Sequence, residues 1–133
     1  MLRSLRGRMS VLTLAALLIS VGGAIAQTPW VAPDAEKGKK NPLPADAKNI
    51  EQGEKIAKIN CASCHGAKGK GDGAAAVALS PKPADWTSDR VQHESDGELF
   101  WKISNGRGPM PPWKHLSESD RWAIILYIRS LKK

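Results

Sequence analysis

Five consecutive residues, Cys61-Ala62-Ser63-Cys64-His65, combine residue types and a spacing that can do chemistry. Two cysteines separated by two residues and followed at once by histidine form the attachment motif for a c-type haem. The two thiols add to the two vinyl groups on one edge of the porphyrin. The imidazole of His65 then lies where it can bind the iron as proximal axial ligand. The chain has only these two cysteines, so haem attachment leaves none for a disulfide.

The same motif has two other interpretations, a redox dithiol and a structural zinc site. A Cys-x-x-Cys pair can be a redox dithiol, but that motif usually joins a strand to a helix in a βαβ pattern, and no such strand is apparent here. A structural zinc site needs four ligands. The cysteines could supply two and the histidines His65, His93 and His115 the others, although the adjacent Cys64 and His65 make an awkward tetrahedral pair. The motif therefore favours haem.

The N-terminus has the three parts of a secretory signal peptide. Residues 1–9 carry three arginines and no acid, residues 11–21 form an apolar core, and Ala24-Ile25-Ala26 has the small–x–small pattern of a cleavage site. We predict a signal peptide over residues 1–26 and export to the periplasm, where thioether formation to haem occurs in bacteria. The alternative is an uncleaved inner-membrane anchor, although the apolar core is short for a spanning helix.

A second iron ligand follows by elimination among the methionines. The other two methionines lie in the predicted leader, so Met110 is the only one in the mature chain. It lies between prolines in the loop 106–112, and prolines reduce the freedom that an unligated loop would keep. This restraint helps a weak thioether–iron bond to persist. Two alternatives stay open: Met110 fills a gap in the core, or His93 or His115 binds the iron.

Removal of residues 1–26 leaves 107 of the 133 residues, enough for one small domain. The formal net charge falls from +7 to +4, because three arginines leave with the leader. No basic run with interleaved aromatic residues is present, which argues against nucleic-acid binding. A modest positive charge favours partners with acidic docking surfaces.

Residues 27–48 contain four prolines and a charged stretch, which predicts an extended arm that buries little. Trp30 either pins this arm to the domain or is exposed to solvent. The remaining residues, 49–133, form the predicted domain.

Three segments of that domain have a helical pattern, and no segment is a convincing strand. Asn49–Asn60 has a rough apolar face and leads directly into Cys61. A capping-box pattern at Ser95 opens a second helix, which the pair Asn105-Gly106 ends. Ser117 opens the last helix, which carries most of the large apolar residues near the C-terminus.

With these motifs the chain resembles a class I monohaem cytochrome c of the soluble bacterial electron-carrier type over residues 49–131. The resemblance rests on the haem motif, on Met110 in a proline-rich loop 45 residues after His65, and on the terminal helix. It implies an all-α class I cytochrome c fold, with three to four helices packed around one covalently bound haem. The site residues implied are Cys61 and Cys64 for the thioether bonds and His65 and Met110 for the iron.

The resemblance also implies how the first and last helices meet. In this family they cross at a small residue eight positions before the first haem cysteine, where this chain has Gly53, and Tyr127 is the matching aromatic residue. The aromatic residue that is common four positions before that cysteine is replaced by Ala57. The crossing is therefore less aromatic than in the family, and Trp122 is a candidate to supply the missing aromatic contact.

Three residues around the haem are assigned by the resemblance alone. A proline carbonyl accepts the ring proton of the proximal histidine in this family, and Pro81 is the candidate here. Such a bond fixes the orientation of the ring and its basicity. Trp86 and Trp113 either donate to the haem propionates or pack around the porphyrin.

The predicted ligand set leaves no coordination position on the iron for oxygen or substrate. Methionine ligation also raises the reduction potential relative to two histidines. We therefore expect a monomeric periplasmic electron-transfer protein that is not an enzyme and meets redox proteins with acidic docking surfaces. Five lysines either steer such partners or merely solvate the surface: Lys68, Lys70, Lys82, Lys102 and Lys114.

Two other functions stay open. The chain could be a cytochrome subunit of a larger periplasmic oxidoreductase, with residues 27–48 as the contact. Less favoured is a haem enzyme in which Met110 leaves the iron.

Overall fold

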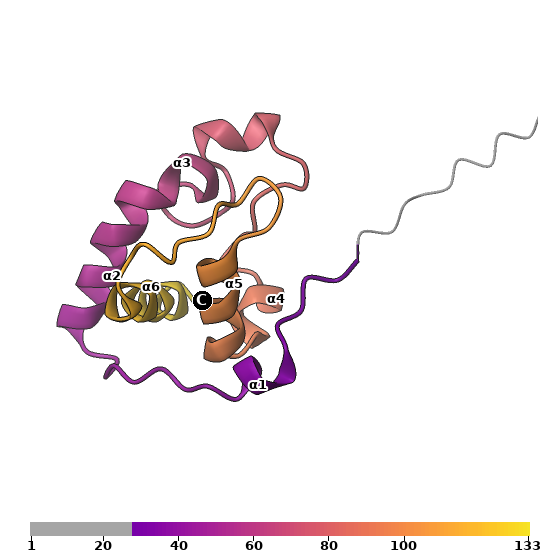
Figure 1. Ribbon diagram of the computed structural model, residues 1–133. Helices are drawn as coiled ribbons and strands as arrows, with labels where there is room; N and C mark the ends of the chain where they lie inside the picture. The colour runs from indigo at the N-terminus through magenta and orange to yellow at the C-terminus, as the bar shows by residue number, and fades with distance from the viewer. Residues whose placement is uncertain (1–27) are drawn as a thin grey trace, which may run out of the picture.

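A computed structural model describes residues 28–133 of the chain, and this range contains helices and no strand (Figure 1). The predicted leader, residues 1–26, lies outside the described residues. The elements in chain order are α1 (Asp34–Lys37), α2 (Ala47–Asn60), α3 (Ala62–His65), the 3₁₀ helix η1 (Ala74–Ala78), α4 (Asp89–His93), α5 (Asp96–Asn105) and α6 (Glu118–Ser130). The expected all-α class is confirmed, because the regular elements of the described residues are all helices.

The three predicted helices form α2, α5 and α6, and local capping explains where they begin. Asp46, Ser95 and Ser117 each accept a hydrogen bond from a backbone N–H in the first turn, at 2.9, 3.1 and 3.0 Å. Each bond satisfies one of the N–H groups that a helix start leaves unpaired. Helix α5 ends at Gly106, whose φ of +63° is the conformation that glycine adopts at low cost. Helix α2 begins two residues earlier than predicted, at Ala47.

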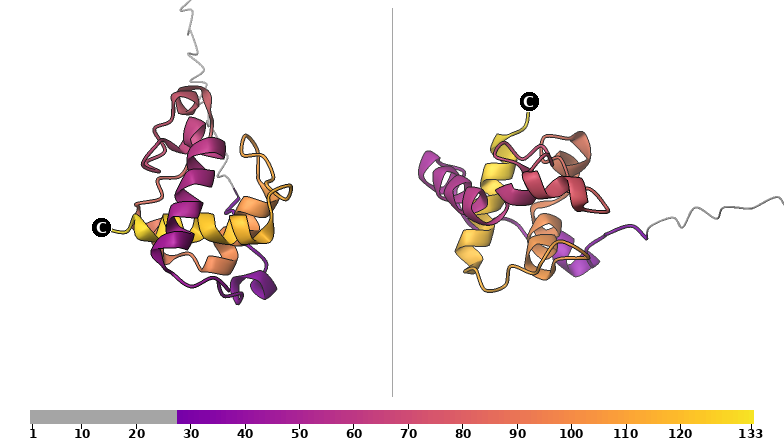
Figure 2. Two further views of the ribbon diagram at one scale, coloured as in Figure 1. Left: turned by 90° about the vertical axis from the view of Figure 1, so that its left-hand side faces the viewer. Right: turned by 90° about the horizontal axis from the view of Figure 1, so that it is seen from above.

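Helices α2 and α6 cross at very short range (Figures 1 and 2). Gly53 of α2 faces the backbone of α6, and a β-carbon at Gly53 would overlap the carbonyl group of Ala123. Ala57, one turn further along α2, is 2% exposed. Small side chains on both helices therefore permit the close approach, and the crossing that the resemblance implied is confirmed.

Aromatic side chains hold α5 and the segment before α4 against α6. Trp122 of α6 stacks on Phe100 of α5 with ring centroids 4.0 Å apart. Trp86 meets the edge of Tyr127 with centroids at 6.3 Å. These four rings belong to one core cluster with the following buried residues: Ala57, Val91, Leu99, Ile103, Ile124, Ile125 and Ile128.

The segment from residue 28 to 46, here the N-terminal strap, differs from the extended arm predicted for residues 27–48. It contains α1, which packs on α5 so closely that a β-carbon at Gly97 would overlap the Glu36 carbonyl. Ala32 is 3% exposed, and Leu43 packs against the core cluster. The segment buries few side chains, as predicted, but it is not a free extended arm, because α1 contacts α5 and Leu43 packs against the core cluster.

Polar contacts also attach the strap to the domain. The Asn41 side-chain amide donates to the Trp122 carbonyl at 2.9 Å. The Lys102 ammonium lies 5.6 Å from the centroid of the Trp30 ring, within the range of a cation–π interaction. Trp30 thus pins the strap, which decides between the two expectations for this residue. Among residues 28–133, no helix is both long enough and apolar enough to cross a membrane.

Candidate haem attachment site

The attachment motif forms a single helical turn that continues from α2. The Cys61 N–H donates to the Ala57 carbonyl at the end of α2, and the His65 N–H donates to the Cys61 carbonyl, both at 2.8 Å. Residues three and four positions apart share one face of a helix. Cys61, Cys64 and His65 have that spacing, so the turn presents both thiols and the imidazole on the same side.

The cysteine thiols are free and half-buried. Burial, and the neighbouring Cys64 to a smaller extent, raise the pKa of the Cys61 thiol to about 11. A nucleophilic dithiol instead needs a cysteine with a depressed pKa, because the thiolate is the reactive form. The motif also follows helix α2 and not a strand, which argues against the redox-dithiol interpretation.

The ligands of a zinc site do not come together in the part of the chain that the structure describes. No group of three or more histidine, cysteine, aspartate or glutamate side chains is placed there to hold a metal ion. His93 and His115, which would have to complete the site, are both exposed. The zinc interpretation therefore fails on geometry.

His65 is buried and oriented by the backbone. Its ring is 9% exposed, and Nδ1 lies 3.0 Å from the Ala84 carbonyl oxygen. A carbonyl can only accept, so Nδ1 carries the proton and Nε2 keeps its lone pair. Burial lowers the pKa of His65, and the bond to Ala84 opposes that shift only in part. The imidazole is thus held neutral, the form that binds a metal.

The acceptor of the His65 proton is Ala84, so the assignment to Pro81 is wrong. Pro81 lies three residues earlier and is exposed. The chain folds back because the Trp86 N–H donates to the Gly69 carbonyl and the Gly71 N–H to the His65 carbonyl, both at 2.7 Å. These bonds bring Ala84 beside the imidazole. Any residue can provide a backbone carbonyl, so no feature of the sequence could have identified Ala84 as the acceptor.

Trp86 covers one face of the His65 ring. The two rings are stacked, with centroids 4.6 Å apart and planes inclined by 24°. Gly69 permits this packing, because a β-carbon there would overlap the Trp86 ring. Trp86 therefore packs beside His65, while Trp113 is half-buried against the core cluster.

Met110 lies in a loop that is closed by its own backbone. Arg107 and Met110 exchange two hydrogen bonds, of 2.9 and 3.0 Å, and the Trp113 N–H donates to the Ile103 carbonyl at 3.1 Å. Met110 itself is half-buried against the same core cluster that Cys61 and Ala84 contact. Two views show this loop and α3 on the same side of α6 (Figures 1 and 2).

The rival histidines lie outside this arrangement. His93 is exposed, with Nδ1 2.6 Å from the Asp89 carbonyl oxygen of its own helix. His115 is exposed, with its ring centroid 5.3 Å from that of Trp113.

One of the five lysines expected around the haem is not available for docking. Lys102 is 8% exposed and forms ion pairs with Glu94 at 2.8 Å and Glu98 at 3.2 Å. Its inclusion among the lysines that could steer a partner is therefore wrong. The Lys82 ammonium donates to the carbonyls of Ala76 and Val77, at 2.8 and 3.0 Å. The other three, Lys68, Lys70 and Lys114, are exposed.

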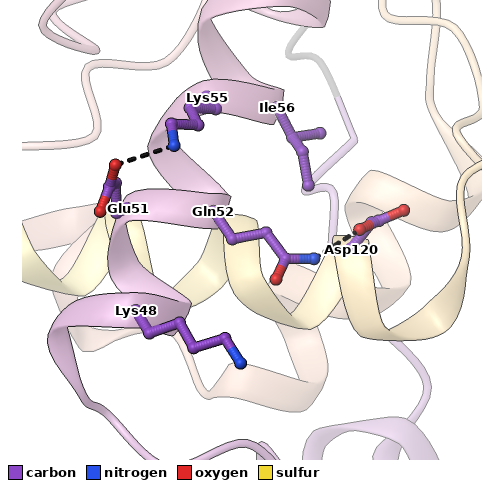
Figure 3. A pocket seen from close by; sticks show the side chains of 6 residues that line it. All are labelled: Lys48, Glu51, Gln52, Lys55, Ile56 and Asp120. Carbon is purple, nitrogen blue, oxygen red and sulfur yellow. Dashed lines mark hydrogen bonds and ion pairs between the residues drawn. The ribbon is translucent and has the colours of Figure 1, made fainter.

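A surface hollow between α2 and α6 is distinct from the attachment site (Figure 3). The Gln52 amide donates to the Asp120 carboxylate at 2.9 Å across it. The side chains that line it include no cysteine, histidine or methionine: Lys48, Glu51, Gln52, Lys55, Ile56 and Asp120. This hollow is open to solvent, and it offers no haem ligand.

Residues 48–128 match a family model described as "Cytochrome C oxidase, cbb3-type, subunit III". A curated relative is the "Cbb3-type cytochrome c oxidase subunit CcoP" of Azospirillum brasilense, 30% identical over 93 residues. The alignment covers 68% of this chain and 31% of the relative. The matched region thus spans about a third of the length of that protein.

Two solved structures have a similar fold. The "Kuenenia stuttgartiensis reducing HAO-like protein complex Kustc0457/Kustc0458" aligns with a TM-score of 0.63 and 31% identity, covering 76% of this chain and 50% of that one. The "KustC0563 c-type cytochrome" aligns with a TM-score of 0.53 and 25% identity, covering 61% of this chain and 98% of that one.

Proposed function

This chain belongs to the c-type cytochrome family described as cytochrome c oxidase, cbb3-type, subunit III, and from that premise we propose that it is a periplasmic carrier of single electrons. Membership implies covalently bound haem c and a role in electron transfer. Our proposal adds that there is one haem, with Cys61 and Cys64 as its attachment residues. His65 and Met110 are the proposed axial ligands.

The convergence of two predicted site residues and of the acceptor for His65 on one cluster carries this proposal. Cys61, Ala84 and Met110 come from three distant parts of the chain and pack against the same core. His65 is bonded to Ala84, with Nε2 left to bind a metal. The donor set, two thiols with one imidazole and one thioether, fits a haem c. When bound, the haem supplies an iron that alternates between the ferrous and ferric states.

The chain's own residues restrict what the site can do. The bond from His65 to Ala84 fixes the ring orientation and increases the basicity of Nε2. Ligation by Met110 would fill the last coordination position, which excludes binding of oxygen or substrate. A closed iron of this kind supports an electron carrier and argues against an enzyme.

The alternative is a cytochrome subunit of a larger oxidoreductase. The matched relatives favour it, because one is an oxidase subunit and another belongs to a protein complex. The c-type cytochrome of which the alignment covers 98% supports a domain that makes up its whole chain, without further domains attached. We propose the free monomer, with redox partners that present acidic docking surfaces.

Purification of the protein from the periplasm of a cytochrome-maturing bacterium tests this proposal. We expect a mass that begins at Gln27 and includes one haem, a monomeric size in solution, and no carbon monoxide binding to the reduced protein. A full-length mass in the membrane fraction would overturn the localisation. Carbon monoxide binding would contradict the claim that all coordination positions of the iron are filled. Co-purification in a stable complex would favour the alternative, a subunit of a larger oxidoreductase.

A further inference from the structure

The loop that carries Met110 is positioned by the two residues that open it. The Gly106 N–H ends α5 by donating to the Lys102 carbonyl at 2.9 Å. The loop folds back on this glycine so closely that a β-carbon there would overlap the Met110 carbonyl oxygen. Arg107 comes next, and its backbone exchanges two hydrogen bonds with the backbone of Met110. Because of these bonds, a movement of Met110 also displaces the backbone of Arg107.

The Arg107 side chain extends out of this loop to the N-terminal strap. Its Nη2 donates to the Thr28 carbonyl oxygen at 2.8 Å, a contact between residues 79 positions apart. A charged donor makes a stronger hydrogen bond than a neutral one. No other side-chain hydrogen bond or ion pair of Arg107 is present within residues 28–133. Truncation of this side chain therefore removes one defined contact between the loop and the strap.

The strap is also fixed to α5 beside the same turn. The Trp30 ring centroid lies 5.6 Å from the Lys102 ammonium, one helical turn before Gly106. Further along the strap, α1 packs against α5 (Figure 1). Thr28 and Trp30 thus contact the chain on both sides of Gly106. The strap therefore provides a fixed point against which Arg107 holds the start of the loop.

The contact between Arg107 and Thr28 depends on the position of the loop. It is present while Met110 packs against the core cluster. When Met110 moves away from the core, the backbone of Arg107 moves with it and the contact to the strap is lost. A contact that is made in only one of two states shifts the equilibrium toward that state. The strap thus favours the position in which Met110 can bind the iron.

We propose that Arg107 is a positioning residue for Met110, which acts by joining the ligand loop to the strap at Thr28. The inference rests on the proposed function, because Met110 must be an axial ligand for its displacement to be measured. The contact makes replacement of Met110 by an external ligand about fivefold less favourable, which corresponds to about 1 kcal/mol for one hydrogen bond.

Imidazole titration of the ferric holoprotein tests this role. Imidazole competes with Met110 for the iron, and loss of the weak charge-transfer band that methionine ligation produces follows the exchange. Arg107→Ala should bind imidazole about fivefold more tightly than the wild type. Arg107→Lys keeps a charged donor and should stay within about twofold of the wild type. The matched control Lys40→Ala removes an equal charge from an exposed position of the strap and should also stay within about twofold.

A second substitution separates the effect of the strap from effects within the loop. Trp30→Ala removes the contact of the strap with Lys102 and should by itself tighten imidazole binding. Because Thr28 is then no longer held in place, Arg107→Ala should change the imidazole affinity of this variant by less than about twofold. An arginine that acts only within its own loop would keep its full effect in both backgrounds.

Three results would overturn this role of Arg107. They are an unchanged imidazole affinity in Arg107→Ala, an equal effect of the Lys40→Ala control, and a full effect of Arg107→Ala in the Trp30→Ala background. A wild-type ferric protein without the charge-transfer band would instead reject Met110 as the axial ligand, so the two proposals fail separately.

Discussion

Gly53 and Ala123 lie so close that a β-carbon on Gly53 would overlap the Ala123 carbonyl. This contact sets the distance between α2, which delivers the attachment motif, and α6, which provides most of the core. Gly53→Ala should therefore lower the free energy of unfolding by about 1–3 kcal/mol, although alanine favours a helix over glycine. Denaturant unfolding followed by circular dichroism measures the change.

Gly38→Ala is the matched control for this substitution. A β-carbon at Gly38 meets nothing within 4 Å, and its φ of −73° suits any residue. We expect no loss of stability in this variant. Equal effects of the two substitutions would contradict a close crossing at Gly53.

Lys102 stabilises the fold through two carboxylates that are nearly as buried as it is. Lys102→Met leaves Glu98 without this ion pair and Glu94 with only the exposed Arg90 as a partner, which should cost about 3 kcal/mol of unfolding free energy. In contrast, Lys55→Met breaks an exposed pair with Glu51 and should cost less than about 1 kcal/mol. Thermal unfolding of the two variants checks the difference, and a cost below that of Lys55→Met would contradict the burial of Lys102.

Sequence pattern predicts the parts of this fold that depend on neighbouring residues. Helices α2, α5 and α6 follow from apolar spacing and capping residues, and the attachment motif and Met110 follow from residue type alone. These signals are local, so they can be recognised in the sequence without knowledge of the tertiary structure.

The features that sequence pattern misses depend on contacts between distant segments. The burial of Lys102 depends on Glu94, which lies before α5, and the docking of the strap depends on Ala32 and Leu43 meeting surfaces of α5 and α6. The acceptor for His65 is a backbone atom of Ala84, which any residue could provide. None of these contacts changes the local pattern of residue types.

Trp86 is expected to support the proximal histidine through packing. Trp86→Ala removes a buried ring that stacks on His65, which should lower the unfolding free energy by about 3–5 kcal/mol. Trp86→Phe keeps a stacked ring and should retain most of the stability. Denaturant unfolding of the two holoproteins measures both values, and an alanine variant within about 1 kcal/mol of wild type would show that the ring contributes little.

Haem attachment is expected to be required for the folded state. A domain of this size supplies a small core of its own, so Cys61→Ala with Cys64→Ala should yield no stable holoprotein. Haem staining after denaturing electrophoresis and far-ultraviolet circular dichroism measure attachment and folding. A haem-free variant with the helical signal of the wild type would contradict this expectation.

The exposed position of His115 provides a control for the axial ligand set. His115→Ala should leave the absorption spectrum and the reduction potential unchanged, because the side chain is exposed. Loss of the low-spin spectrum in this variant would indicate ligation by two histidines and a low-potential haem.

Substitution of Met110 tests the central claim most directly. Ligation of ferric iron by methionine gives a weak charge-transfer band at the red end of the visible spectrum. Residues 28–133 contain no other methionine, and the alanine methyl group cannot coordinate iron. Met110→Ala should therefore abolish this band, lower the reduction potential and allow carbon monoxide to bind the reduced protein. An unchanged band and potential in Met110→Ala would contradict the proposed histidine–methionine electron carrier.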